Sequence, residues 1–339
     1  MRLRNKIGNI TFPISFLNDK YFIIGVNNEF QLFDGSDVVG FKDTKIKETG
    51  FKKIKNKLYF FDEKKITQID LETLNGKVFL EFQSDELWLL NDGFYLYANK
   101  TTERREYKFD YYSKVENRIL WSAIDKLELT NLSNKFLIFS NLNRTIYARY
   151  NIISGMKIWT LDFSENRING NVLLIDNVLV FPTTNQDLIG IEIETGKELW
   201  RLPNCNLHHQ QQPNTNYLVG LASNSFGDNF YQVIDPISGK KLIDKKFKDF
   251  FYETQPTLAC ITATHYYFIS NVIGDGTGTK SERLTHLGCI NLQTHEIEWI
   301  EKVGTTADRR SSFQKPEING NKIYLLNGEQ TLHIYELER

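Results

Sequence analysis

The stretch that decides the fold is Ile191-Glu192-Ile193-Glu194-Thr195-Gly196-Lys197-Glu198-Leu199-Trp200. An alternating apolar and polar run, typical of a strand, leads into a polar Thr-Gly-Lys turn, and the run that follows carries a tryptophan. Glycine suits such a turn because it adopts positive φ without steric cost. The stretch therefore predicts two antiparallel strands joined by a tight turn.

The same pattern recurs along the chain. A polar residue equivalent to Glu192 precedes each turn at a spacing of about 41 residues, with one longer gap at the end. These anchors are Asp70, Asp110, Asn151, Glu192, Asp235 and Asn291. Each follows a hairpin of two strand-like runs, such as 136–140 with 145–150, and further hairpins at 21–33 and 322–335 bring the expected number to eight. Such units must stack, because one of them alone cannot bury both faces of its sheet.

The stacked units are expected to close into a ring. Phe (24 residues) and Tyr (16 residues) are abundant, and aromatic side chains favour strands. Radial closure leaves few sheet edges exposed. We therefore expect an all-β fold: a single β-propeller of about eight four-stranded blades, or seven, that forms one domain over residues 1–339. The last unit ends after its third strand, so residues 2–7 are expected to supply the outer strand and close the ring.

The repeat also resembles a known family. The pattern Asp-x-x-Thr-Gly-Lys-x-x-Trp, with Glu192 in the first place here, is similar to the repeat of pyrroloquinoline-quinone-type propellers. Quinoprotein dehydrogenases and a bacterial outer-membrane assembly lipoprotein share that repeat. The resemblance covers about 60–339 well and 1–59 weakly. For an enzyme of the family it would imply an exported protein with adjacent cysteines near the cofactor and a catalytic Asp beside calcium. This chain has no adjacent cysteines, so we expect no quinone-dependent activity and no cofactor.

Composition argues against several classes of protein. The 41 basic and 42 acidic residues nearly cancel, which gives no sign of a nucleic-acid partner. No apolar run reaches the length of about 18 residues that a membrane helix needs, and the basic start 1–6 is not followed by the apolar segment of a signal peptide. Cys205, Cys260 and Cys289 are widely spaced, and the last two fall in apolar strands where a thiol acts as a small hydrophobe. We expect a cytoplasmic protein without a membrane span.

Candidate binding residues lie where the repeat is broken. The segments 203–214, 248–256, 272–283 and 303–314 interrupt it, and several of them connect the outer strand of one blade with the inner strand of the next. Such loops converge on one face of a ring, around its central funnel, or else form a set of solvated loops. The partner-binding residues predicted in these segments are His208, His209, Gln210, Tyr252, Glu253, Gln255, Arg309, Arg310 and Asp275, and Phe226, an aromatic residue of a further insert, is predicted with them.

The segments carry little recognisable chemistry. The glycine-rich run 274–281 is not a phosphate loop, because Thr279 stands where such a loop needs glycine before its lysine. Asp275 alone offers too few oxygens for calcium, and the adjacent His208 and His209 are poorly placed to hold one zinc ion. We therefore predict no catalytic, cofactor-binding or metal-binding residue.

Two classes of function remain open. The first is a non-enzymatic propeller that binds another protein, with a bacterial immunity protein that neutralises a cognate toxin as one specialisation. A rigid ring suits this role because little conformational entropy is lost on association. The alternative is an enzyme, or a sugar or small-molecule binder, that uses polar residues at the funnel. Capture of a stoichiometric partner would favour the first class, and turnover in a substrate screen would favour the second.

Overall fold

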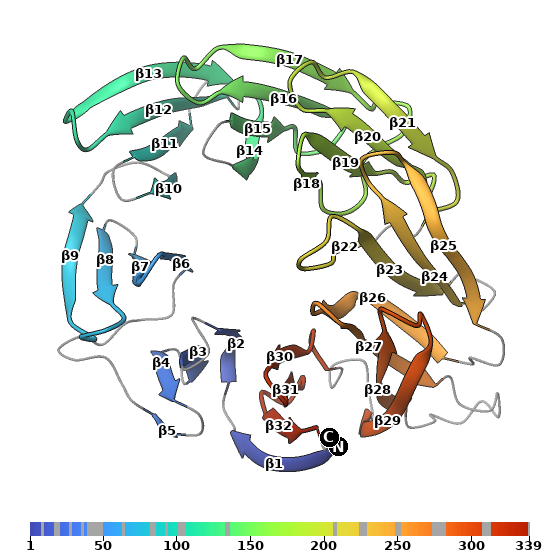
Figure 1. Ribbon diagram of the computed structural model, residues 1–339. Helices are drawn as coiled ribbons and strands as arrows, with labels where there is room; N and C mark the ends of the chain where they lie inside the picture. The colour runs from blue at the N-terminus through green and yellow to red at the C-terminus, as the bar shows by residue number, and fades with distance from the viewer. Residues whose placement is uncertain are drawn as a thin grey trace. The chain divides into compact units, whose positions relative to one another are not determined.

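β-Strands make up nearly all of the regular structure in this computed structural model, as predicted, and no helix occurs within the residues it describes. Those residues are 1–7, 10–16, 21–26, 29–34, 37–38, 50–62, 65–81, 86–91, 94–100, 106–132, 136–205, 209–223, 229–247, 252–272, 283–306 and 313–337. Hydrogen bonding groups the strands into eight four-stranded sheets. Each sheet is antiparallel, and seven of them follow the chain in order (Figure 1).

Two compact units make up the chain. The first unit contains Met1–Phe41, Lys45–Glu48 and Asn204–Arg339, and the second contains Lys42–Thr44 and Thr49–Pro203. Four sheets lie in each unit.

The second unit contains the most regular repeats. Its first sheet joins β6 (Gly50–Ile54), β7 (Lys57–Asp62), β8 (Lys65–Asp70) and β9 (Gly76–Glu81). Its second sheet joins β10 (Glu86–Asn91), β11 (Phe94–Lys100), β12 (Tyr107–Ser113) and β13 (Arg118–Asp125). Its third sheet joins β14 (Glu128–Leu132), β15 (Phe136–Ser140), β16 (Ile146–Asn151) and β17 (Lys157–Asp162). Its fourth sheet joins β18 (Leu173–Ile175), β19 (Val178–Pro182), β20 (Leu188–Glu192) and β21 (Glu198–Leu202).

The first unit combines both ends of the chain. One sheet joins β2 (Ile10–Phe16), β3 (Tyr21–Val26), β4 (Glu29–Asp34) and β5 (Asp37–Val38). A second joins β22 (Gln210–Gln211), β23 (Leu218–Ser223), β24 (Asn229–Asp235) and β25 (Lys240–Phe247). A third joins β26 (Tyr252–Ile261), β27 (His265–Val272), β28 (Arg283–Asn291) and β29 (Ile297–Thr306). The fourth joins β30 (Glu317–Asn319), β31 (Lys322–Leu326), β32 (Leu332–Glu336) and β1 (Arg2–Ile7).

The outer strand of this last sheet comes from the N-terminal segment. β1 pairs antiparallel with β32, from Arg2 opposite Glu336 to Ile7 opposite Leu332. The sequence predicted this pairing from the missing fourth strand of the last repeat.

The predicted number of blades is wrong. About eight full blades, or seven, were expected, but only six of the sheets consist of four strands with three or more residues each. In the other two sheets one edge strand, β5 or β22, has two residues. Pro213 follows β22 closely and lacks the N–H that a longer ladder would need. The repeat that ends in β5 has neither the Thr-Gly turn nor the outer tryptophan of the regular repeats.

Hydrophobic cores lie between consecutive sheets. One cluster joins Phe109 and Tyr111 of β12 to Leu137 and Phe139 of β15. Equivalent clusters lie between the third and fourth sheets of the second unit and on both faces of the β26–β29 sheet in the first unit. Each sheet is therefore stabilised chiefly by burying apolar faces against its neighbours.

Tryptophans of the outer strands link one sheet to the next. Trp121 of β13 donates its indole N–H to the carbonyl oxygen of Ile152 in the next sheet, at 2.8 Å. Its ring lies over Gly155, which has φ +67°. Trp159 donates in the same way to Ile193, also at 2.8 Å. The Thr-Gly turn and the tryptophan, which identified the repeat in the sequence, thus belong to one contact between sheets.

A carboxylate strengthens one of these contacts. Asp125 at the end of β13 forms an ion pair with Lys157 of β17 at 2.7 Å and accepts a hydrogen bond from the Tyr150 hydroxyl. Burial raises the pKa of Asp125, but the hydrogen bonds from Lys157 and Tyr150 outweigh burial and hold the pKa below its ordinary value. The carboxylate is therefore ionised at neutral pH.

The two outermost strands of six sheets share a β-bulge. One residue of the outer strand, directly before the position of the tryptophan, has no partner in the register. A bulge of this kind turns the side chain away from the regular alternation of a strand. The bulge residues are Phe79, Leu120, Ile158, Leu199, Leu242 and Glu298.

Candidate functional site

The predicted binding residues fall into three groups. His209 and Gln210 are described with their side chains, and His209 is buried directly before β22. Tyr252, Glu253 and Gln255 lie in β26, whose backbone is described there. The remaining five lie outside the described residues: His208, Phe226, Asp275, Arg309 and Arg310.

The structure brings the first two groups onto neighbouring strands. The Gln210 side-chain amide donates to the carbonyl oxygen of Ala259 in β26 at 2.7 Å. Gln212 donates in the same way to Ala263 at 3.0 Å. The glutamines thus tie the first strand of one sheet to the first strand of the next. Gln210 therefore has this structural role in addition to any role in binding.

A half-buried carboxyl, that of Glu317, lies near the thiol of Cys260 in β26. Burial raises the pKa of the Glu317 carboxyl in β30, which the positive charge of Lys315 partly opposes. Burial, and then the negative charge of Glu317, raises the pKa of the Cys260 thiol to about 11. Cys260 is therefore protonated at neutral pH and is a poor nucleophile.

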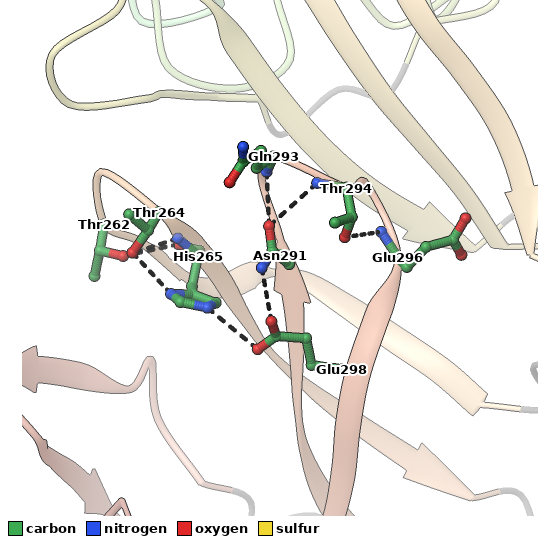
Figure 2. A network of polar contacts seen from close by, with 8 residues as sticks. All are labelled: Thr262, Thr264, His265, Asn291, Gln293, Thr294, Glu296 and Glu298. Atoms are coloured by element: carbon green, nitrogen blue, oxygen red, sulfur yellow. Dashed lines mark hydrogen bonds and ion pairs between the residues drawn. The ribbon is translucent and has the colours of Figure 1, made fainter. Parts of the chain in front are cut away.

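A second polar cluster lies on the β26–β29 sheet and was not predicted. It brings together His265 at the start of β27, Cys289 in β28 and Glu298 in β29 (Figure 2 shows His265 and Glu298). His265 pairs with Asn291, two residues beyond Cys289, so His265 and Cys289 lie on the same face of the sheet. Glu298 is the bulge residue of β29, between Ile297 and Trp299, which both have partners in β28.

Hydrogen bonds fix the side chains of His265 and Glu298 in this cluster. Nε2 of His265 lies 3.2 Å from Oε2 of Glu298, and Nδ1 of His265 lies 2.8 Å from the hydroxyl of Thr264. The other carboxylate oxygen of Glu298 accepts from the side-chain amide of Asn291 at 2.7 Å. Asn291 is held in turn by the backbone N–H groups of the turn that follows it (Figure 2).

Cys289 completes the cluster from the core side. The residue is buried. Burial, and after it the negative charge of Glu298, raises the pKa of the Cys289 thiol to about 12, and a hydrogen bond from Tyr267 partly opposes this rise. One ligand atom from each of His265, Cys289 and Glu298 lies within 4.8 Å of the other two. Nitrogen, sulfur and oxygen donors therefore converge on one point of the sheet.

The sequence contains a signal for this cluster. The residue before the outer tryptophan is Leu120, Ile158 or Leu199 in three repeats, whereas Glu298 precedes Trp299. Glu298 is therefore a charged residue at an apolar position of the repeat. Its partners could not be identified from sequence, because His265 comes from a strand that the repeat pattern does not align with Cys289.

Apolar side chains project from the turns of the second unit. Val115 lies in the turn between β12 and β13 and is 82% exposed, and Ile153 and Met156 lie in the turn between β16 and β17 and are 81% and 65% exposed. These turns are equivalent ends of consecutive sheets, and Trp121 of one sheet packs under Gly155 of the next. We call Val115, Ile153 and Met156 the turn patch.

The turn patch has a defined backbone. The Asn151 side chain accepts hydrogen bonds from the backbone N–H groups of Ile153 at 2.9 Å and Ser154 at 3.0 Å. The carbonyl oxygen of Asn151 also accepts from Gly155 at 2.9 Å. The exposed side chains of Ile153 and Met156 are therefore presented by a fixed turn.

Several solved structures are similar to this chain. The C-terminal WD40 domain of Sif2 matches with a TM-score of 0.65 at 9% identity, over 100% of this chain and 98% of that one. BamB from Moraxella catarrhalis matches with a TM-score of 0.55 at 12% identity, over 99% of both chains. A europium-containing methanol dehydrogenase matches with a TM-score of 0.56 at 9% identity, over 96% of this chain and 84% of that one.

Comparisons by sequence give no match. No family model matches the chain, and no curated protein does. Among the described residues no helix is long and apolar enough to cross a membrane. BamB and the methanol dehydrogenase are propellers of the type that the repeat resembles, which supports that resemblance at the level of fold. The similar structures together show that this chain has the β-propeller fold.

Proposed function

We propose that the chain is a non-enzymatic, cytoplasmic β-propeller that binds another protein through the turn patch. Propeller folds of the WD40 and BamB kind typically serve as scaffolds for protein interactions. The single observation that carries the proposal is the exposure of Val115, Ile153 and Met156 on neighbouring turns. Exposed apolar side chains gathered on one part of a surface are a mark of interaction sites.

The rigidity of the turn supports binding. Asn151 fixes the backbone of Ile153, and the Trp121 ring packs under the same turn at Gly155. Ordering a flexible loop reduces affinity, whereas a surface that is already ordered avoids that loss. The turn patch would therefore contribute its apolar area to binding with little entropic penalty.

Capture from cells of the native organism tests the proposal. The tagged protein is used as bait, and co-purifying proteins are identified by mass spectrometry. We expect one stoichiometric partner with the wild type and its loss with the double variant Ile153→Asp/Met156→Asp. Leu142→Asp is the matched control, because Leu142 is 71% exposed in the turn between β15 and β16, at the other end of the same sheet.

The outcomes separate the classes of function. Retention of the partner by the double variant, or its loss with the Leu142→Asp control as well, would show that the turn patch is not the binding site. The absence of any stoichiometric partner would count against the protein-binding function itself.

A bacterial immunity protein that neutralises a cognate toxin is the specialisation we propose within this class. The absence of a recognisable cofactor signature in the sequence is consistent with a protein that acts by binding alone. Gene neighbourhood gives the first test: a toxin gene should lie beside this gene. Co-expression of that toxin with the double variant should then restore toxicity.

The half-buried carboxyl of Glu317 favours a second candidate, a small-molecule or sugar-binding enzyme at the inner strands. Carboxyls with a raised pKa are common where general acids act. This function predicts turnover in a substrate screen that Glu317→Gln abolishes and that the turn-patch variants retain.

A further inference from the structure

We propose that His265, Cys289 and Glu298 form a binding site for a divalent transition-metal ion, with Zn²⁺ as the preferred ion. The three side chains come from three adjacent strands of one sheet and direct one ligand atom each to a common point. This site lies in the first unit and is independent of the turn patch, which belongs to the second.

The spacing of the ligand atoms suits a tetrahedral site. With Zn–S near 2.3 Å and Zn–N or Zn–O near 2.0–2.2 Å, ligand atoms around zinc lie about 3.3–3.8 Å apart. Nε2 of His265 and Oε2 of Glu298 are already 3.2 Å apart, and all three ligand atoms lie within 4.8 Å of one another. Closing the site therefore needs side-chain adjustments of about 1 Å, without a change in the pairing of the strands.

The donor atoms select the class of ion. Calcium and magnesium prefer shells made of oxygen, whereas one thiolate, one imidazole and one carboxylate suit zinc and its neighbours in the transition series. Three protein ligands leave the fourth position of a tetrahedral site for water or for a group of another molecule. That position can be reached from solvent, because the side chains of His265 and Glu298 are 28% and 38% exposed.

Outer hydrogen bonds hold the ligands as they do in known zinc sites. A metal-binding histidine usually has its second ring nitrogen hydrogen-bonded, and here the Thr264 hydroxyl lies 2.8 Å from Nδ1 of His265. The ligating carboxylate is likewise hydrogen-bonded, through Asn291 to Oε1 of Glu298 at 2.7 Å (Figure 2). Both contacts leave Nε2 of His265 and Oε2 of Glu298 directed toward each other and toward the metal position.

The repeat itself makes Glu298 exceptional. Five other sheets have the same bulge, and each carries an apolar residue there: Phe79, Leu120, Ile158, Leu199 and Leu242. Only Glu298, among the bulge residues that the structure describes, carries a charge, and it stands next to the imidazole of His265. Departures from an otherwise consistent structural rule are expected at functional sites.

The alternative is a plain ion pair between His265 and Glu298 beside a core thiol. Zinc binding distinguishes the two, because an ion pair needs no metal. The thiolate also gives a specific signature, since Co²⁺ bound to sulfur shows a thiolate-to-cobalt charge-transfer band in the near ultraviolet. A thiol must lose its proton to bind a metal ion, so binding through Cys289 should release one proton per ion.

The test uses the full chain after treatment with a chelator and dialysis. ZnCl₂ is titrated by calorimetry, bound zinc is counted by elemental analysis, and CoCl₂ is added to a separate sample for absorption spectra. We expect one Zn²⁺ per chain, a rise in melting temperature on its addition, and a cobalt–thiolate band. Thr264→Val, which removes an outer hydrogen bond, should weaken zinc binding about 10-fold.

Two ligand variants and a control complete the experiment. Glu298→Leu installs the residue type of Leu199 and Leu242 and should fold normally while it weakens zinc binding more than about 100-fold. Cys289→Ala should abolish the cobalt–thiolate band. If Cys289→Ala fails to fold, Glu298→Leu alone tests the site. Cys260→Ser, which changes a thiol outside the site, should bind zinc as the wild type does. The absence of stoichiometric zinc in the wild type, or unchanged zinc affinity in Glu298→Leu, would overturn the proposal.

Discussion

The substitution Gly155→Ala tests the contact that joins consecutive sheets. A Cβ added at Gly155 would lie 2.5 Å from an atom of the Trp121 ring, well inside the distance of ordinary contact. The ring is not free to move away. It stacks on the ring of Tyr111 with centroids 5.3 Å apart, and its N–H donates to the carbonyl oxygen of Ile152. The clash must therefore be relieved by shifting the turn or by breaking the indole hydrogen bond.

The loss of stability expected in Gly155→Ala has two parts. Placing an alanine at φ +67° costs about 1–2 kcal/mol, and the lower entropy of the unfolded chain returns about 0.4–1 kcal/mol of that. Overpacking against a fixed ring adds about 1–3 kcal/mol. We expect Gly155→Ala to lower the free energy of unfolding by about 1–4 kcal/mol in total.

Gly320→Ala is the matched control. Gly320 has nearly the same backbone angle, φ +60°, but nothing lies within 4 Å of the position where its Cβ would be. Its cost should be the strain alone, about 1 kcal/mol or less. Urea unfolding followed by tryptophan fluorescence and circular dichroism measures both variants, and coincident transitions justify a single free energy of unfolding.

Equal costs for Gly155→Ala and Gly320→Ala would refute the reasoning, because backbone strain would then explain both. A double-mutant cycle with Trp121→Leu adds a second check. Once the ring is removed, Gly155→Ala should cost no more than the Gly320→Ala control, which corresponds to a coupling of about 1–3 kcal/mol.

Three further predictions concern other contacts. Asp125→Asn should destabilise the protein by about 1–2 kcal/mol at pH 7, and this deficit should shrink below about pH 4, because the carboxylate stabilises the folded state only while it is ionised. Urea unfolding at pH 7 and pH 3 measures it, and a deficit independent of pH would contradict the assignment. Deletion of residues 1–8 should lower the melting temperature by about 5–10 °C, because β32 loses its partner β1, and an unchanged melting temperature would exclude a stabilising role for that strand. Ile153→Asp should leave the free energy of unfolding within about 0.5 kcal/mol of the wild type, since its side chain is solvent-exposed, and a larger loss in urea unfolding would mean that the turn patch supports the fold.

The sequence predicted the regular parts of the fold well. The runs 136–140 and 145–150 became β15 and β16, because alternating apolar residues and a turn specify a hairpin locally. The link between Trp159 and the next turn, which the structure shows, is made by the same repeated residues. The number of full blades did not follow, because β5 and β22 are cut short by the absence of a suitable turn or by a nearby proline. The single domain over 1–339 and the cytoplasmic location stay predictions.

The candidate sites were harder to predict than the fold. Loop residues were chosen because they break the repeat, and the structure shows that Gln210 also bonds to the next sheet. The cluster of His265, Cys289 and Glu298 depends on the register of three strands and on a bulge in the third. Neither can be read from the composition of one strand, although the charged residue before Trp299 marks the place.

The contact between Trp121 and Ile152 joins two unlike surfaces, a donor on one sheet and an acceptor on the next. The donor lies on the outer strand of one sheet and the acceptor in the turn of the next, so the two surfaces in contact are different rather than equivalent. Such a heterologous contact can be repeated from any copy to the next, as in an assembly of identical subunits. Duplication of one repeat within the gene would supply both a new donor and a new acceptor. Propellers of this kind can therefore change length by whole repeats during evolution while each added sheet finds a complementary neighbour.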